Sequence, residues 1–250
     1  MQRTMRNTAS LLVLAAALSG TFASAQAADL PVYSKAPAMA VEAWNPWMIR
    51  LRAVGVLPDG RSSVNVMSPS PTLMGLSSPN SSLHINDQVI PELDISYFFT
   101  QNLAAELILG VSRHSISGTG ALAGLPVGKT TVLPPTLTMQ YHFTQFGAFK
   151  PYVGVGVNYS TFFDTKAANT FGTNGLEAYR TTRLSLGDSF GAVAQIGFDY
   201  MIDRHWGLNF DVKKVWMRPE YSATVNGAVP VVGTAHIDPW LVGGGVTYKF

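Results

Sequence analysis

The sequence of 250 residues contains no cysteine. A disulfide framework and a lipid anchor on cysteine are therefore both excluded. Charged residues make up only 13% of the chain and hydrophobic residues 47%, yet beyond the N-terminal segment no stretch reaches the roughly 18 apolar residues of a membrane-spanning helix. Such a composition is typical of an outer-membrane β-barrel, with a soluble β-sandwich as the alternative.

Neither sign of charge dominates the chain. It has 17 Lys and Arg residues against 15 Asp and Glu residues, and two of the basic residues, Arg3 and Arg6, lie in an N-terminal segment that we expect to be removed. The mature chain is then close to neutral. Because a nucleic-acid partner requires a basic face or stripe, the sequence argues against nucleic-acid binding.

The sequence also lacks a recognisable catalytic or metal-binding motif. No nucleophile, base and orienting group fall together, and the histidines have none of the short spacings of metal ligands. These histidines are His84, His114, His142, His205 and His236. We therefore expect no enzyme activity, no cofactor and no metal. Gly154 and Gly156 alternate within an apolar strand, where they leave room in a crowded interior rather than forming a phosphate-binding loop.

The N-terminal segment has the features of a secretory signal. Arg3 and Arg6 precede the apolar run 11–18, and small residues follow to position 27, which predicts a cleaved signal peptide over 1–27. A membrane anchor is the alternative, but the apolar run is short for a spanning helix. Residues 28–45, rich in Ala and Pro, predict a flexible periplasmic arm before a barrel over 46–250.

Eight segments with alternating or continuous apolar residues predict strands. They span 46–57, 87–99, 103–114, 135–146, 151–163, 186–201, 206–218 and 237–250. The connections alternate between short turns and long segments rich in Ser, Thr, Gly and Asn, the long ones being 58–86, 115–134, 164–185 and 219–236. This predicts an all-β fold, an eight-stranded antiparallel up-and-down transmembrane barrel with short periplasmic turns and long extracellular loops.

The last predicted strand alternates up to the final residue. One face carries Trp240, Tyr248 and Phe250, while Lys249 belongs to the other face. A closed barrel must pair its last strand with its first, since an open edge facing lipid would leave backbone groups without partners. We therefore expect this strand to close the barrel, and its three aromatic residues to serve as a C-terminal signal for the barrel-assembly machinery.

Aromatic residues cluster near the predicted strand ends, where aromatic girdles meet the lipid headgroups. The general preference of aromatic residues for strands explains some of them equally well. The predicted girdle comprises Trp47, Tyr97, Phe98, Phe99, Tyr141, Phe143, Phe146, Tyr152, Tyr159, Phe162, Phe163, Tyr200, Trp206, Trp216, Trp240, Tyr248 and Phe250.

Alternation also assigns the charged residues to the inner face, because a charge on the lipid face would cost several kcal/mol. An eight-stranded barrel is just wide enough for side chains to fill. We therefore predict a lumen plug of paired charges in the periplasmic half. Its members are Arg50, Arg52, Glu92, Asp94, Glu106, Asp199, Asp211 and Lys249.

Several sequence segments resemble the outer membrane protein W (OmpW) family. They lie at 134–137, 140–143, 151–164, 186–191, 197–202 and 238–240, and the resemblance extends from Trp47 to the end of the chain. It implies a monomeric eight-stranded barrel in the bacterial outer membrane, in contact with its lipids. It also implies a narrow, largely hydrophobic channel that is closed toward the periplasm and assists small hydrophobic or amphipathic molecules, with sideways exit into the bilayer.

Two further expectations concern the passage. Pro134 and Pro135 cannot donate backbone hydrogen bonds, so they predict a weakened lateral seam between the third and fourth strands, unless they merely begin a strand. Ile108 and Lys213 stand at the level of the family's apolar constriction, where a lysine is unexpected. Either Lys213 pairs with Glu106 or Asp211, or the passage is more polar than usual. The alternative function is a structural or surface-interaction barrel, such as an adhesin or a receptor for phage or bacteriocin.

Overall fold

The computed structural model describes residues 44–250 except 60, 68–76 and 78–79. The chain divides into two units, Met1–Ala43 and Trp44–Phe250, and the described residues belong to the second. The predicted signal peptide (1–27) lies outside the described residues, as does the predicted arm (28–45) up to residue 43. Within the described part of the chain, no helix is long and apolar enough to cross a membrane.

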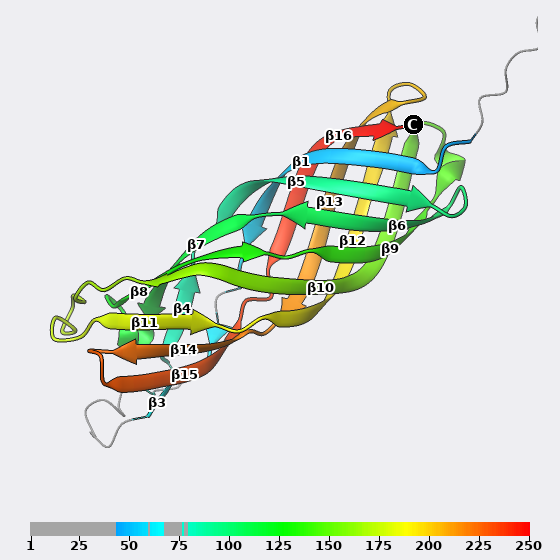
Figure 1. The fold of residues 1–250 in the computed structure, drawn as a ribbon. Coiled ribbons are helices and arrows are strands. Elements are labelled where there is room, and N and C mark those ends of the chain that lie inside the picture. Colours follow the sequence, from blue (N-terminus) through cyan, green and yellow to red (C-terminus); the bar gives the residue numbers. More distant parts are fainter. Residues whose placement is uncertain (1–43, 60, 68–76, 78–79) are drawn as a thin grey trace, which may run out of the picture. The chain divides into compact units, whose positions relative to one another are not determined.

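Eight strands form a closed antiparallel barrel (Figure 1). They are β1 (Trp47–Leu57), β5 (Gln88–Phe98), β6 (Leu103–Gly110), β9 (Thr136–His142), β10 (Phe149–Ala167), β12 (Ser189–Met201), β13 (Trp206–Met217) and β16 (Trp240–Lys249). Each strand pairs with its neighbours in the chain order of this set, and β16 pairs with β1 over ten residue pairs. The predicted up-and-down barrel and its closure by the last strand are confirmed.

Short turns join β5 to β6, β9 to β10 and β12 to β13 at the end where β1 begins. In the first, the Thr100 hydroxyl accepts the backbone N–H of Leu103 at 2.9 Å. In the third, Asp203 Oδ1 accepts the backbone N–H groups of His205 and Trp206, each at 2.7 Å. These two hydrogen bonds lower the pKa of the Asp203 carboxyl, and the bond from Trp206 has the larger effect. The turn between β9 and β10 contains the 3₁₀ helix η3 (Thr144–Phe146). Short turns mark the periplasmic end of a barrel.

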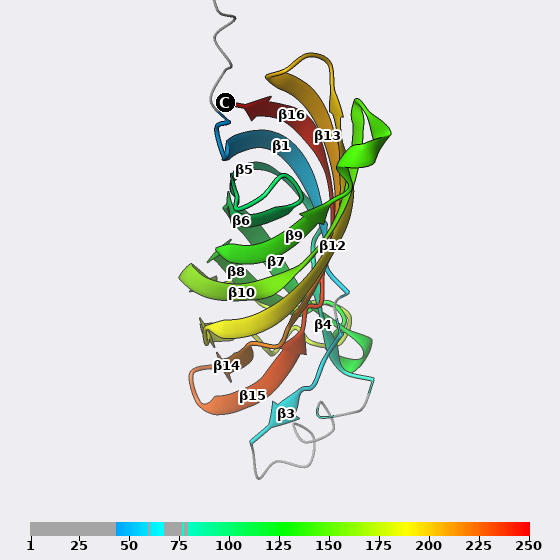
Figure 2. The same ribbon diagram turned by 90° about the vertical axis from the view of Figure 1, so that its right-hand side faces the viewer.

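The eight barrel strands lie close to their predicted boundaries, but the long connections are not irregular loops and contain further strands that the sequence did not predict. They contain β2 (Arg61–Ser62), β3 (Asn65–Val66), β4 (Ser82–Ile85), β7 (Ser112–Thr119), η2 (Gly120–Leu122), β8 (Pro126–Leu133), β11 (Thr181–Leu186), β14 (Glu220–Val225) and β15 (Val229–His236). Figure 1 shows β11, β14 and β15 at the end opposite the C-terminus, and Figure 2 shows β14 and β15 at the same end. Strand residues such as Val225 and Val231 pack there around an apolar core of their own, which stabilises the wall beyond the bilayer.

Side chains of the barrel strands alternate between lipid and lumen as predicted. In β1, Leu51 is 57% exposed on the outside, whereas Arg52 is 3% exposed and points inward. This period of two follows from the pleat of a strand. Because the outer face meets hydrocarbon, every charged residue of β1 has to lie on the inner face.

Candidate functional site in the barrel lumen

The inward side chains change from polar to apolar at one level of the barrel. In β13 the inward residues are Asn209, Asp211 and Lys213, followed toward the extracellular end by Val215 and Met217. The same change occurs between Arg52 and Val54 in β1, between Glu92 and Ile90 in β5, between Glu106 and Ile108 in β6, and between Gln195 and Val193 in β12. On these five strands the inward face is therefore polar toward the periplasm and apolar toward the extracellular end, whereas β9 and β10 keep polar inward residues such as Thr136 and Asn158.

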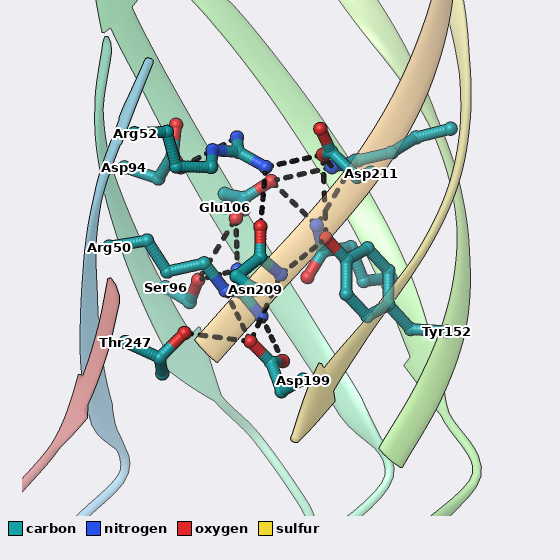
Figure 3. Close-up of polar contacts among 12 residues, drawn as sticks. Arg50, Arg52, Asp94, Ser96, Glu106, Tyr152, Asp199, Asn209, Asp211 and Thr247 are labelled. Carbon is teal, nitrogen blue, oxygen red and sulfur yellow. Dashed lines mark hydrogen bonds and ion pairs between the residues drawn. The ribbon is translucent and has the colours of Figure 1, made fainter. Parts of the chain in front are cut away.

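Arg50 is the centre of the lower polar layer (Figure 3). Its Nε and Nη2 donate to the two carboxylate oxygens of Asp199 at 3.0 and 2.6 Å, and its Nη1 donates to Glu106 and, at 3.2 Å, to Ser96. The guanidinium also lies 5.1 Å from the centroid of the Tyr152 ring. A fork-shaped cation with two carboxylates and an aromatic face is held in one geometry.

Arg52 and Lys213 form the upper polar layer. Arg52 Nη2 lies 2.7 Å from Glu92 and 2.6 Å from Asp94, and its Nη1 forms an ion pair with Asp211. Lys213 Nζ lies 2.8 Å from Glu92 and 3.2 Å from Asp211. Two cations thus share the carboxylates of Glu92 and Asp211, and all five side chains are at most 5% exposed.

Two glutamines connect the layers. Gln140 Nε2 donates to Glu106 Oε2 at 2.6 Å, and Gln195 Nε2 donates to Asp211 Oδ2 at 2.6 Å. Gln140 also donates to the side-chain oxygen of Gln195 at 3.0 Å. A buried carboxylate is costly unless its oxygens are paired and hydrogen-bonded. The two glutamine amides therefore supply hydrogen bonds to carboxylates that also form ion pairs with the cations.

We call this network of three cations and five carboxylates the charged plug. It comprises Arg50, Arg52, Lys213, Glu92, Asp94, Glu106, Asp199 and Asp211. Five of the eight barrel strands contribute to it, so its ion pairs cross the lumen. The charged groups of the plug form ion pairs with one another. Such a layer of side chains fills and closes this half of the barrel.

Directly above the charged plug lies an apolar cavity of about 80 Å³, counted as space open to the centre of a water molecule. Glu92 and Lys213 contribute to its lining from the plug side. The apolar lining includes Ile90, Ile108, Phe162, Val193, Val215 and Met217. The cavity has several times the volume that one water molecule requires, and its mainly apolar lining also includes polar side chains such as Thr136 and Asn158.

The wall of this cavity contains an interruption in the sheet. β6 pairs with β9 up to Ile108 opposite Thr136, and β7 pairs with β8 from Ser112 opposite Val132. The two ladders share one register. Between them, residues 109–111 lie opposite Leu133, Pro134 and Pro135 without forming backbone pairs. A proline has no N–H to donate to the missing ladder.

The opposite edge of the proline segment is well bonded. The backbone N–H of Tyr159 in β10 donates to the carbonyl of Pro135 at 3.0 Å. Asn158 Nδ2 donates to the carbonyl of Pro134 at 3.1 Å, and the Thr136 hydroxyl donates to the same carbonyl at 3.0 Å. The interruption is therefore confined to the boundary between β6–β7 and β9–β8.

A family model described as the OmpW family matches residues 47–250. The chain belongs to the OmpW family. It is 46% identical to the uncharacterized outer-membrane protein y4mB of Sinorhizobium fredii over 98% of this chain and 99% of that protein. It is 36% identical to outer membrane protein W of Vibrio cholerae, over 76% of this chain and 87% of the relative.

Solved structures agree with this OmpW-family fold. The crystal structure of the outer membrane protein OprG from Pseudomonas aeruginosa matches with a TM-score of 0.68 and 27% identity, covering 82% of this chain and 95% of that chain. The protein is thus a non-enzymatic barrel of the bacterial outer membrane, in contact with its lipids.

Seven of the eight residues predicted for the plug of this OmpW-family barrel lie together in the charged plug. The eighth, Lys249, instead places its ammonium group 5.0 Å from the centroid of the Phe98 ring near the periplasmic end. Lys213 was predicted at the constriction beside Ile108, with pairing to Glu106 or Asp211 as one alternative. It forms ion pairs with Asp211 and also with Glu92. The residue therefore belongs to the plug, while Ile108 lines the cavity above it.

Sequence reasoning misplaced three aromatic residues of the predicted girdle. Tyr152 is 1% exposed and Phe98 is 4% exposed, and Phe162 lines the lumen cavity, so all three lie on the inner side rather than at the headgroups. The Tyr152 hydroxyl donates to Asp211 Oδ2 at 3.3 Å. Alternation along the strand could have placed Tyr152 correctly, because it lies on the same inward face of β10 as Gly154 and Asn158.

The three aromatic residues of the predicted C-terminal signal lie on the outer face of the closing strand. Trp240 and Phe250 are 50% and 47% exposed. The Tyr248 ring packs edge-on against Trp206 and Phe250, with ring centroids 4.8 and 4.9 Å apart. This outer aromatic row is open to lipid and to any protein that handles the barrel from the membrane side.

Three histidine side chains, those of His114, His142 and His205, form hydrogen bonds in the described part of the chain. The His114 ring bonds the carbonyl of Asn86 at 3.0 Å and the hydroxyl of Ser112 at 2.9 Å. His142 bonds Gln140 at 3.0 Å. Among the residues that the structure describes, no group of three or more His, Cys, Asp or Glu side chains is arranged to hold a metal ion.

Proposed function

We propose that this barrel admits small hydrophobic or amphipathic molecules from the extracellular side and releases them sideways into the bilayer. The observation that carries the proposal is the position of the apolar cavity, which stands directly on the charged plug. An apolar molecule gains about 25 cal/mol for each Å² that it removes from water in such a compartment. It gains nothing by entering a layer of paired charges, so the plug ends its path toward the periplasm.

The volume of the cavity defines how such a molecule would be accommodated. At about 80 Å³ the cavity is small for a hydrophobic solute. A protein cavity of about 150 Å³ holds one benzene molecule. Passage therefore requires rotation of side chains in the lining, and Met217 and Leu186 are unbranched at Cβ and suited to such movement.

The interrupted ladder supports a sideways exit. Gly110 and Pro134 line the cavity, and they belong to the boundary where residues 109–111 and 133–135 form no ladder pairs with one another. Parting the wall at this place breaks fewer backbone hydrogen bonds than at any fully paired boundary. Pro134 and Pro135, which lie between β8 and β9, thus form the weakened seam of our proposal.

The name of one relative supports a hydrophobic solute. A Pseudomonas aeruginosa protein that is 24% identical over 79% of this chain is called dibenzothiophene metabolism operon protein PahQ. Dibenzothiophene is a fused aromatic molecule without a charged group. Its chemistry fits the apolar lining above the charged plug.

The proposal predicts that Ile108→Trp lowers the uptake of a hydrophobic fluorescent probe by at least fivefold in cells that express the protein. Ile108 is 4% exposed and lines the cavity, so an indole at this position fills the space. The matched control is Leu107→Trp, on the lipid side of the same strand and 39% exposed. Uptake that is the same for wild type and both variants would favour a structural or surface-interaction barrel.

A further inference from the structure

The extracellular wall carries a cluster of basic residues on its outer face. Arg113 of β7, Lys129 of β8, Lys166 of β10 and Arg183 of β11 are all exposed and point outward. Lys129 and Lys166 are direct cross-strand partners. Although the total charge of the chain is near neutral, four cations thus lie together on one part of the outer wall.

One acidic residue lies within this cluster. Asp164 has the left-handed backbone angle φ 49°, and its carboxylate lies 2.7 Å from the ammonium of Lys166. It also interacts electrostatically with Arg113. One carboxylate against four cations leaves an excess of three positive charges, and pairs of like charge that face one another across a sheet are destabilising unless an anion lies between them.

A groove adjoins the cluster where the wall is not continuous. β10 pairs with β12 only up to Ser160 and pairs with β8 beyond that point, while β11 pairs with β14. In the described part of the chain β10 and β11 share no ladder. An open groove of about 520 Å³ extends from β10 over β11, β14 and β15, and its lining includes Arg183 and the hydroxyl-bearing residues Thr165, Ser185, Ser222 and Thr224.

The position of the cluster relative to the bilayer follows from the register. Phe163 is 45% exposed and lies in one cross-strand row with Thr131 and Arg113. Exposed aromatic residues of a barrel mark the headgroup level. Lys129 and Lys166 form the next outward row, about 7 Å farther along the strands, where the headgroups of the outer leaflet lie.

We infer that this basic cluster and its groove bind the phosphorylated sugar headgroup of an outer-leaflet glycolipid. The four cations are placed to contact phosphates, and the groove offers hydroxyl groups and one guanidinium to a saccharide. The bound headgroup bridges β10 and β11, which the backbone leaves unjoined. This lipid site lies on the outer wall and is separate from the lumen and from the passage of hydrophobic molecules.

The test is native mass spectrometry of the detergent-solubilised full-length protein with lipid A that carries two phosphates. Wild type is expected to bind this lipid at least tenfold more tightly than the variant Arg113→Gln, Lys129→Gln, Lys166→Gln and Arg183→Gln. Lipid A stripped of its phosphates is expected to bind both proteins equally weakly. The unfolding midpoint without lipid shows that the variant is folded.

A matched control removes four cations from other faces, namely Arg61, Lys150, Arg204 and Arg218, each replaced by Gln. It is expected to keep wild-type affinity. Equal affinity of the cluster variant and wild type would overturn the inference, as would an equal loss in the control, because attraction would then be non-specific. Binding of phosphatidylglycerol as tight as that of phosphorylated lipid A would refute recognition of the sugar.

Discussion

Replacement of Arg52 by alanine is expected to lower the free energy of unfolding by about 3–5 kcal/mol. Arg52 forms ion pairs with Glu92, Asp94 and Asp211 in the lumen. Lys213 remains beside two of these carboxylates, but Asp94 loses the only cation with which it forms an ion pair among the described residues. Breaking a buried pair costs much because the charge left behind has neither water nor a partner.

The measurement is urea unfolding of the protein in lipid vesicles, followed by tryptophan fluorescence. Arg61→Ala is the matched control, because Arg61 also pairs with a carboxylate, Asp59, but its side chain is 79% exposed. An exposed pair contributes only about 0–1 kcal/mol. If Arg52→Ala were no more destabilising than Arg61→Ala, the plug would be open to water and would not close the lumen.

A disulfide across the interrupted ladder is expected to reduce uptake of a hydrophobic probe at least tenfold. The register shared by the two flanking ladders places Gly110 opposite Pro134. A side chain on Gly110 would meet the flexible end of Ile90 at 3.3 Å, which can move aside. Because the chain has no cysteine of its own, oxidation of the variant Gly110→Cys, Pro134→Cys locks this boundary alone, and a reductant releases it.

The control pair is Leu107→Cys with Leu137→Cys, which are cross-strand partners in the intact part of the same boundary. Uptake is expected to be equal in the oxidised and reduced forms of this pair. Loss of uptake on oxidation of both pairs would show only that the barrel must be flexible. Undiminished uptake by the locked Gly110–Pro134 protein would show that hydrophobic molecules leave by another route.

Much of the barrel followed from period-two alternation alone. Once Leu107 is assigned to lipid, Glu106 and Ile108 have to face the lumen, and the structure places both there. The change from polar to apolar inward residues is also visible in the sequences of β1, β5, β6, β12 and β13. Such local features predict which residues share the lumen, because the pleat ties every side chain to one face.

Partners across the lumen could not be predicted in this way. Arg50 and Asp199 are 149 residues apart and meet only because of the stagger of the closed barrel. Lys213 looked like an anomaly in an apolar constriction until its distance to Glu92 placed it in the plug. The strands of the long connections were missed because residues such as Thr181 and Thr224 belong to polar segments whose pairing depends on long-range contacts.

We expect hydrophobic molecules to occupy the apolar cavity and to stop at the charged plug. A crystal structure of the protein soaked with a bromoalkane would show where they bind, because anomalous scattering locates the bromine. The expected result is a peak among Ile108, Val193 and Val215 and none below Arg52. A bromine atom bound between Arg50 and Asp199, or no bromine in the cavity at saturating concentration, would contradict it.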